Sequence, residues 1–146
     1  MKVEAILKSK GRSVETIEPW ATVAEAVRRL AGPPQLGALV VCADSERRVA
    51  GVISERYIVT ALAKHGAQLP DLQVEDVMSK DFPVCSLQDS VVHVMQEMTR
   101  SRHRHLPVVE HGTLCGLVSI GDLVKNRLEE MEVERGVLRD LYAVRR

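Results

Sequence analysis

The chain has 146 residues, 45% of them apolar and 27% charged, which suits one globular domain or two small, tightly paired ones. Its 20 basic and 20 acidic residues cancel, and aromatic residues make up only 3%, so neither a basic field nor stacking platforms for nucleic acid are present. The apolar runs are too short to span a bilayer, the N-terminus lacks a signal-peptide core, and the 3 cysteines are widely spaced. We therefore expect a cytoplasmic protein with free thiols and without nucleic-acid or membrane partners.

The first half of the chain predicts the order strand, helix, strand, strand, helix. A short strand over residues 14–17 precedes Thr22, which suits the N-cap of a helix with apolar residues on one face. The apolar runs ALVVCA and VAGVIS on either side of a polar turn indicate a β-hairpin. The following segment indicates a helix that ends at Gly66.

The second half repeats this order after a polar linker. The repeated segments are FPVCS, SVVHVMQEMTR, HLPVVE, CGLVSI and GDLVKNRL. The sequence thus predicts a first unit over residues 1–68, a linker over 69–79 and a second unit over 80–128. Because neither unit can cover both faces of so small a sheet, we expect them to pack on each other about a pseudo-twofold axis. The predicted fold class is α/β (α+β).

Residues 129–146 extend the last helix beyond the repeat. Apolar residues recur at spacings of 4, 3, 7 and 4, close to a heptad pattern that Arg135 interrupts. These residues are Val124, Leu128, Met131, Leu138 and Tyr142. Gly136 costs a helix roughly 1 kcal/mol relative to alanine, so a bend or break is expected there. The stripe could pack on its own module, contact a second subunit or signal to another protein, and we favour contact between subunits.

Polar residues gather where the second unit's strands meet its helices. Ser119 and Asp122 in GLVSIGDLV lie at a strand–helix junction, where they can cap the helix or bind a ligand. Arg104 and His105 directly precede the apolar strand LPVV. An arginine fork suits phosphate, although a solvated basic helix end would have the same composition. We favour ligand binding for both pairs.

These motifs resemble the tandem CBS (cystathionine β-synthase) domain pair, also called a Bateman module. The resemblance rests on the duplicated pattern together with RHLPVVE, GLVSIGDLV and DVMSKDFPVC, and it covers residues 1–128. KGRSVETI and ISERYIVTAL are similar to the small stand-alone bacterial and organellar members. The resemblance implies a regulatory module that binds AMP, ADP, ATP, NAD or S-adenosylmethionine between its two units. It also implies a homodimer that forms a disk of four units.

The resemblance also assigns roles to residues. Asp122 would grip the ribose hydroxyls, and Ser119, Arg104 and His105 would contact ribose or phosphate. By the pseudo-symmetry of the family, the first unit would complete this site with its own residues. These are Lys10, Gly11, Arg12, Leu36, Gly37 and Ala38.

The first unit keeps a serine at Ser54 but has Tyr57 where the acid would stand. The tyrosine could fill the pocket or stack on a base, so we expect one good site and one altered site. The altered site would comprise Ser54, Arg56, Tyr57, Lys80, Pro83 and Val84.

Three functions compete on the sequence alone. A nucleotide sensor that acts on an unidentified partner protein and dimerises through the disk and the C-terminal helix is favoured. A ligand-free dimerisation scaffold is the alternative, because Tyr57 weakens one site. An enzyme is not expected, since the sequence has no P-loop and no paired carboxylates at a cleft. No metal is expected either, because the pair His103 and His105 lacks further ligands.

Overall fold

The structure, a computed structural model, describes residues 1–144. The first unit contains β1 (Thr16–Ile17), α2 (Val23–Ala31), β2 (Ala38–Cys42), β3 (Val49–Ser54) and α3 (Glu55–His65). Its sheet has the order β1-β2-β3, with β1 parallel and β3 antiparallel to β2. The predicted order of elements is confirmed for this unit.

Local signals account for the ends of these elements. The side chain of Thr22 accepts a hydrogen bond from the amide of Glu25 at 3.2 Å, which caps α2 as predicted. Gly66, at φ 59°, follows the last residue of α3, and its amide bonds the carbonyl of Leu62. The predicted linker, residues 69–79, contains the second half of a 3₁₀ segment, η1 (Gly66–Asp71), and the short α4 (Val74–Val77). Val74 is fully buried in the first unit's core, so the linker is part of that unit.

The second unit contains α5 (Val91–Ser101), β4 (His105–Glu110), β5 (Thr113–Ser119) and α6 (Ile120–Val144). Strands β4 and β5 form an antiparallel hairpin whose turn residues both have positive φ, as a tight two-residue turn requires. The strand expected over FPVCS is reduced to one parallel bridge between Cys85 and Val108.

The N-terminal helix α1 (Val3–Lys10) was not expected from the sequence. Val3, Ile6 and Leu7 are buried in the core of the second unit, although the sequence assigned residues 1–68 to the first. Leu7 packs directly on Gly116 of β5, because a Cβ added there would lie 2.5 Å from a Leu7 methyl carbon. The helix that begins the chain therefore completes the core of the second unit.

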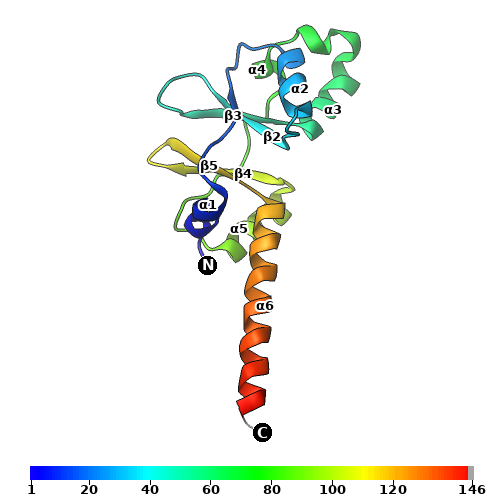
Figure 1. The fold of residues 1–146 in the computed structure, drawn as a ribbon. Coiled ribbons are helices and arrows are strands. Elements are labelled where there is room, and N and C mark those ends of the chain that lie inside the picture. Colours follow the sequence, from blue (N-terminus) through cyan, green and yellow to red (C-terminus); the bar gives the residue numbers. More distant parts are fainter. Residues whose placement is uncertain (145–146) are drawn as a thin grey trace.

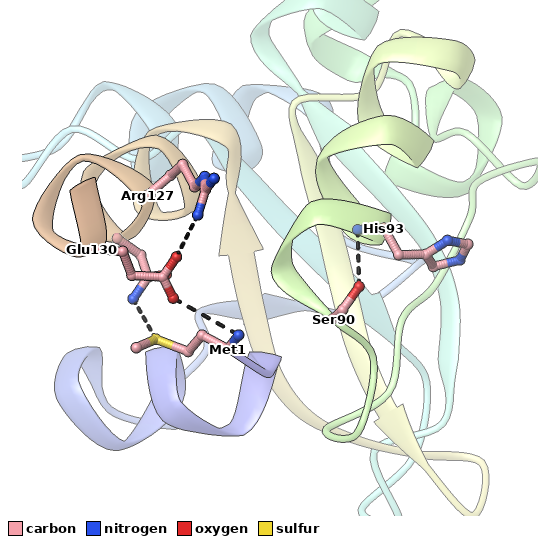
Figure 2. Close-up of polar contacts among 6 residues, drawn as sticks. Met1, Ser90, His93, Arg127 and Glu130 are labelled. Carbon is pink, nitrogen blue, oxygen red and sulfur yellow. Dashed lines mark hydrogen bonds and ion pairs between the residues drawn. The ribbon is translucent and has the colours of Figure 1, made fainter. Parts of the chain in front are cut away.

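Polar contacts hold this arrangement at the N-terminus. The amino group of Met1 lies 3.7 Å from Oε1 of Glu130, and Arg127 contacts the other carboxylate oxygen, Oε2, at 2.9 Å (Figure 2). In the same view, Ser90 Oγ accepts the amide of His93 at 3.1 Å and caps α5. The start of the chain is thereby joined to the middle of α6.

The two units pack on each other, as expected. The hairpins of the two units are in contact. Val40 and Cys42 of β2 form a buried cluster with Leu114 of β5. The amide of Leu114 also donates to the carbonyl of Arg47 across the interface, at 2.9 Å.

Helix α6 packs on the second unit over its first turns and then runs away from both units (Figure 1). It has 25 residues and continues through Gly136, so the expected break does not occur. Every residue from Met131 to Val144 is exposed, and the apolar stripe does not pack on its own module. Among residues 1–144, no helix combines the length and the hydropathy needed to cross a membrane.

Candidate ligand-binding site

Ser119 and Asp122 cap the helix that begins after β5. The amide of Asp122 donates to Ser119 Oγ at 3.1 Å, and Asp122 Oδ2 accepts the amide of Ser119 at 2.9 Å. Each side chain thus satisfies the other residue's backbone donor, which is the geometry of a capping box. Both residues keep lone pairs for further partners, so capping does not exclude ligand binding.

Lys10 joins this pair from the end of α1. Its Nζ atom lies 2.5 Å from Asp122 Oδ2 and 2.9 Å from the carbonyl oxygen of Leu117. Burial alone would raise the pKa of Asp122, but the hydrogen bonds from Lys10 and Ser119 together lower it below its usual range. We call Lys10, Ser119 and Asp122 the Asp122 cluster.

A cleft of about 640 Å³ lies between the two units on the side of Tyr57. This volume is within the roughly 300–1,000 Å³ of typical small-molecule sites. The residues that line this Tyr57 cleft are Gly37, Ala38, Val52, Ser54, Glu55, Arg56, Tyr57, Val59, Thr60, Arg102, His103, Arg104 and His105.

Contacts between the units join residues that line the Tyr57 cleft. The hydroxyl of Tyr57 is 2.8 Å from Nε2 of His103, and their rings are tilted at 42°. Arg56 Nη1 donates to the carbonyl oxygen of Arg102 at 2.9 Å. His103 Nδ1 is buried and has no hydrogen-bond partner among the described residues. Side chains of the first unit therefore contact the segment that precedes β4 in the second unit.

His105 lies between the cleft and the Asp122 cluster. It pairs with Ser119 in the β4–β5 ladder, and its ring packs on Gly37, where an added Cβ would be 2.4 Å from Nε2. Burial is the main cause that lowers the pKa of His105, and Lys10 adds to the effect. The imidazole is therefore neutral at pH 7 and forms a wall common to both regions.

The structure groups the candidate residues differently from the sequence. Gly37 and Ala38, which were assigned to the site of Asp122, line the Tyr57 cleft with Arg104 and His105. The cause is strand register, because Ala38 lies opposite Ser54 in the β2–β3 hairpin and so faces the start of α3. Of the first-unit residues expected at Asp122, the structure brings Lys10 into direct contact.

Other assigned residues lie apart from these two regions. Gly11 and Arg12 are exposed beyond the end of α1, and Leu36 packs against the first unit's core. Within the described chain, the cleft lining does not include Lys80, Pro83 or Val84.

Two residues of the cleft lining, Arg102 and His103, were not predicted to bind a ligand. Arg102 was not among the candidate site residues, and His103 was considered only as a metal ligand. Arg102 ends α5 in a left-handed conformation at φ 59°, which turns the chain so that both residues reach the cleft. The alternation RSRHRH before an apolar strand was the available signal. In residues 1–144, no cluster of three or more His, Cys, Asp or Glu side chains is arranged to hold a metal ion.

The fold and these two regions define a tandem pair of small α/β units with a cleft between them. The CBS domain model matches residues 11–64 and 74–129, and the chain belongs to the CBS-domain family. Proteins built on such pairs are generally regulatory, ligand-binding modules.

Similar proteins include solved and curated examples. A CBS-domain-containing protein from Agrobacterium tumefaciens has 38% identity and a TM-score of 0.81, covering 87% of this chain and 99% of its own. A mitochondrial CBS-domain-containing protein of Arabidopsis thaliana is 32% identical, over 90% of this chain and 67% of its own. A hexameric CBS-CP12 protein from bloom-forming cyanobacteria has 26% identity and a TM-score of 0.73, covering 99% of this chain and 88% of its own.

Proposed function

We propose that this protein is a regulatory module that binds an adenosyl ligand between its two units and acts on a partner protein without catalysing a reaction. The observation that carries the proposal is the Tyr57 cleft, which has the volume of a small-molecule site and basic residues from both units. Candidate ligands are AMP, ADP, ATP, NAD and S-adenosylmethionine. They have the adenosyl group in common, and all but S-adenosylmethionine also carry phosphate.

The cleft supplies complementary parts for such a ligand. Arg56, Arg102 and Arg104 are available for phosphate, because guanidinium groups bind phosphate oxygens in a bidentate way. The ring of His105 covers Gly37, so a base in this part of the cleft would meet the imidazole and not bare backbone.

The Asp122 cluster is the second proposed binding position. The carboxylate of Asp122 can accept two vicinal ribose hydroxyls, and Ser119 Oγ lies beside it. Lys10 now holds one of the carboxylate oxygens, so a ribose must displace its ammonium group. The displaced lysine would then be free to contact a phosphate.

We further propose that the protein forms a homodimer through the disk faces and α6. Large apolar side chains are exposed on α3, where Val59 is 67% and Leu62 is 54% accessible. The stripe on α6 is exposed as well, and apolar surface of this extent in a small protein marks an interaction site. A related protein with the same domain is described as hexameric, which favours assembly over a single chain.

Isothermal titration of the dialysed protein with ATP, AMP, NAD and S-adenosylmethionine tests the proposal. We expect saturable binding of at least one of them at one or two sites per chain. Asp122→Ala should remove one position, and Arg104→Gln should weaken the other. Arg100→Gln is the matched control, because Arg100 pairs with Glu97 on exposed helix surface. Absence of heat and of thermal stabilisation with every ligand would favour the alternative, a dimerisation scaffold.

A further inference from the structure

The Tyr57 cleft lacks the carboxylate that we propose to bind a ribose at the equivalent place in the second unit. Tyr57 follows Ser54 by three residues, as Asp122 follows Ser119. A phenol offers one hydroxyl, whereas a carboxylate offers two acceptor oxygens to a diol. The hydroxyl of Tyr57 is also already engaged by His103 at 2.8 Å.

The charges of the cleft favour an anion instead. The cleft is lined by Arg56, Arg102 and Arg104, and Glu55 is the acidic residue of the lining. The net charge of the lining is therefore positive. Both units contribute arginines to the same cleft, which concentrates the positive potential there. Arg56 donates to the carbonyl oxygen of Arg102, and this hydrogen bond positions one guanidinium group in the lining of the cleft.

The start of α3 adds backbone donors to this basic cleft. Within residues 1–144, the Ser54 side chain makes no capping hydrogen bond, whereas Ser119 caps α6 through the amide of Asp122. The first amides of α3 therefore remain available to an anion, and the helix dipole favours negative charge there.

We propose that the Tyr57 cleft recognises the phosphate chain of its ligand and not the ribose. Its ligand class is the di- or triphosphate group, whether carried by a nucleotide or free as pyrophosphate or tripolyphosphate. Three arginines and the amides of α3 match several phosphate oxygens, which a single phosphate would not engage together. This inference deepens the proposed function and rests on the same cleft.

The test uses Asp122→Ala, in which the proposed ribose position is removed, and the wild-type protein beside it. Each is titrated with sodium tripolyphosphate, pyrophosphate, ATP, AMP and adenosine in metal-free buffer at constant ionic strength. In Asp122→Ala we expect tripolyphosphate and ATP to bind with similar affinity, AMP to bind about tenfold more weakly or worse, and adenosine not to bind. Added salt should weaken the binding of both polyphosphates.

Substitutions in the lining make the test specific. Arg56→Gln and Arg104→Gln should each weaken tripolyphosphate binding about tenfold, and Arg100→Gln should leave it unchanged. Tyr57→Asp, combined with Asp122→Ala, should create adenosine binding and weaken tripolyphosphate. Thermal melting of each variant verifies that it remains folded, and having two arginine variants keeps the test intact if one of them fails to fold.

The outcomes separate the two proposals. Binding of adenosine to Asp122→Ala in competition with ATP would overturn the phosphate-chain inference and leave the adenosyl proposal standing. Binding of tripolyphosphate without a preference for ATP, and without any adenosine binding to the wild type, would support the inference and remove the adenosyl proposal. If no phosphate compound binds to Asp122→Ala, the inference is wrong, and adenosine binding to the wild type then decides the proposed function.

Discussion

The Nζ atom of Lys10 lies 2.5 Å from Oδ2 of Asp122, so the last residue of α1 is paired with the first turn of α6. The side chain of Asp122 is 26% exposed and has a backbone partner as well, the amide of Ser119. The same carboxylate is therefore a helix cap, an ion-pair partner and a candidate ribose acceptor.

Asp122→Asn should destabilise the protein by about 1 kcal/mol at pH 7, because it removes the ion pair and weakens the cap. The folded state lowers the pKa of Asp122, so its stabilisation is complete above the usual aspartate pKa of about 3.9. It is lost as the pH falls through the lower pKa of the folded state. Urea unfolding at pH 7 and in acid should show the difference between wild type and variant shrinking in acid. Asp140→Asn, on the exposed part of α6, is the control, and an equal change there would contradict this explanation.

His105 should make stability fall as the solution becomes mildly acidic. Its pKa is lowered in the folded protein, so the unfolded chain binds a proton first when the pH drops below about 6.5. The charged groups around it are Lys10, Arg104, Asp122 and Glu55, of which the two acids oppose the effect.

Unfolding free energies of wild type and His105→Gln between pH 8 and pH 5.5 test this dependence. The loss of stability on acidification should be smaller in His105→Gln than in the wild type. His93→Gln, at an exposed position on α5, should behave as the wild type does. Parallel curves for the wild type and His105→Gln would show that another group is responsible.

Leu7→Ala should cost about 2–5 kcal/mol, the range for buried leucines whose removal leaves a cavity. Leu7 is 1% exposed and packs against the second unit's core. Chemical denaturation measures the loss, and Val92→Ala, on α5 with a side chain that is 48% exposed, is the control. A loss below about 0.5 kcal/mol would mean that α1 does not contribute to this core in solution.

Gly136→Ala should strengthen α6 by about 1 kcal/mol, the difference between the two residues in a helix interior. A Cβ at this position has no atom within 4 Å among the described residues, so no clash offsets the gain. Far-UV circular dichroism should show higher helix content and a later loss of it on heating. An unchanged spectrum would indicate that another contact already determines the end of α6.

The elements that were predicted correctly depend on short-range signals. Thr22 and Ser90 cap their helices with partners three residues away, and the turn at His111 and Gly112 needs no distant contact. Helix α1 has apolar residues at helical spacing too, but its partners begin at Cys85, far along the chain. The local sequence pattern could therefore have predicted the helix, but it could not have predicted the unit in which the helix packs.

The grouping of the candidate site was predictable only in part. The pairing of Ser119 with Asp122 follows from their spacing at a helix start. The placement of Gly37 beside His105 depends on how two hairpins from different units meet, and that geometry is absent from either segment alone. The replacement of the acid by Tyr57 was visible, but its bond to His103 was not.

The position of α1 also bears on how the chain folds during synthesis. The first unit, with its own buried cluster, can close while the ribosome is still making the rest of the protein. Helix α1 has left the ribosome by then, yet its apolar side chains must remain uncovered until the strands of the second unit emerge. Helix α1 is thus made before the first unit but finds its partners after it, and a nascent chain stalled between the units would expose the apolar face of α1 to chaperones.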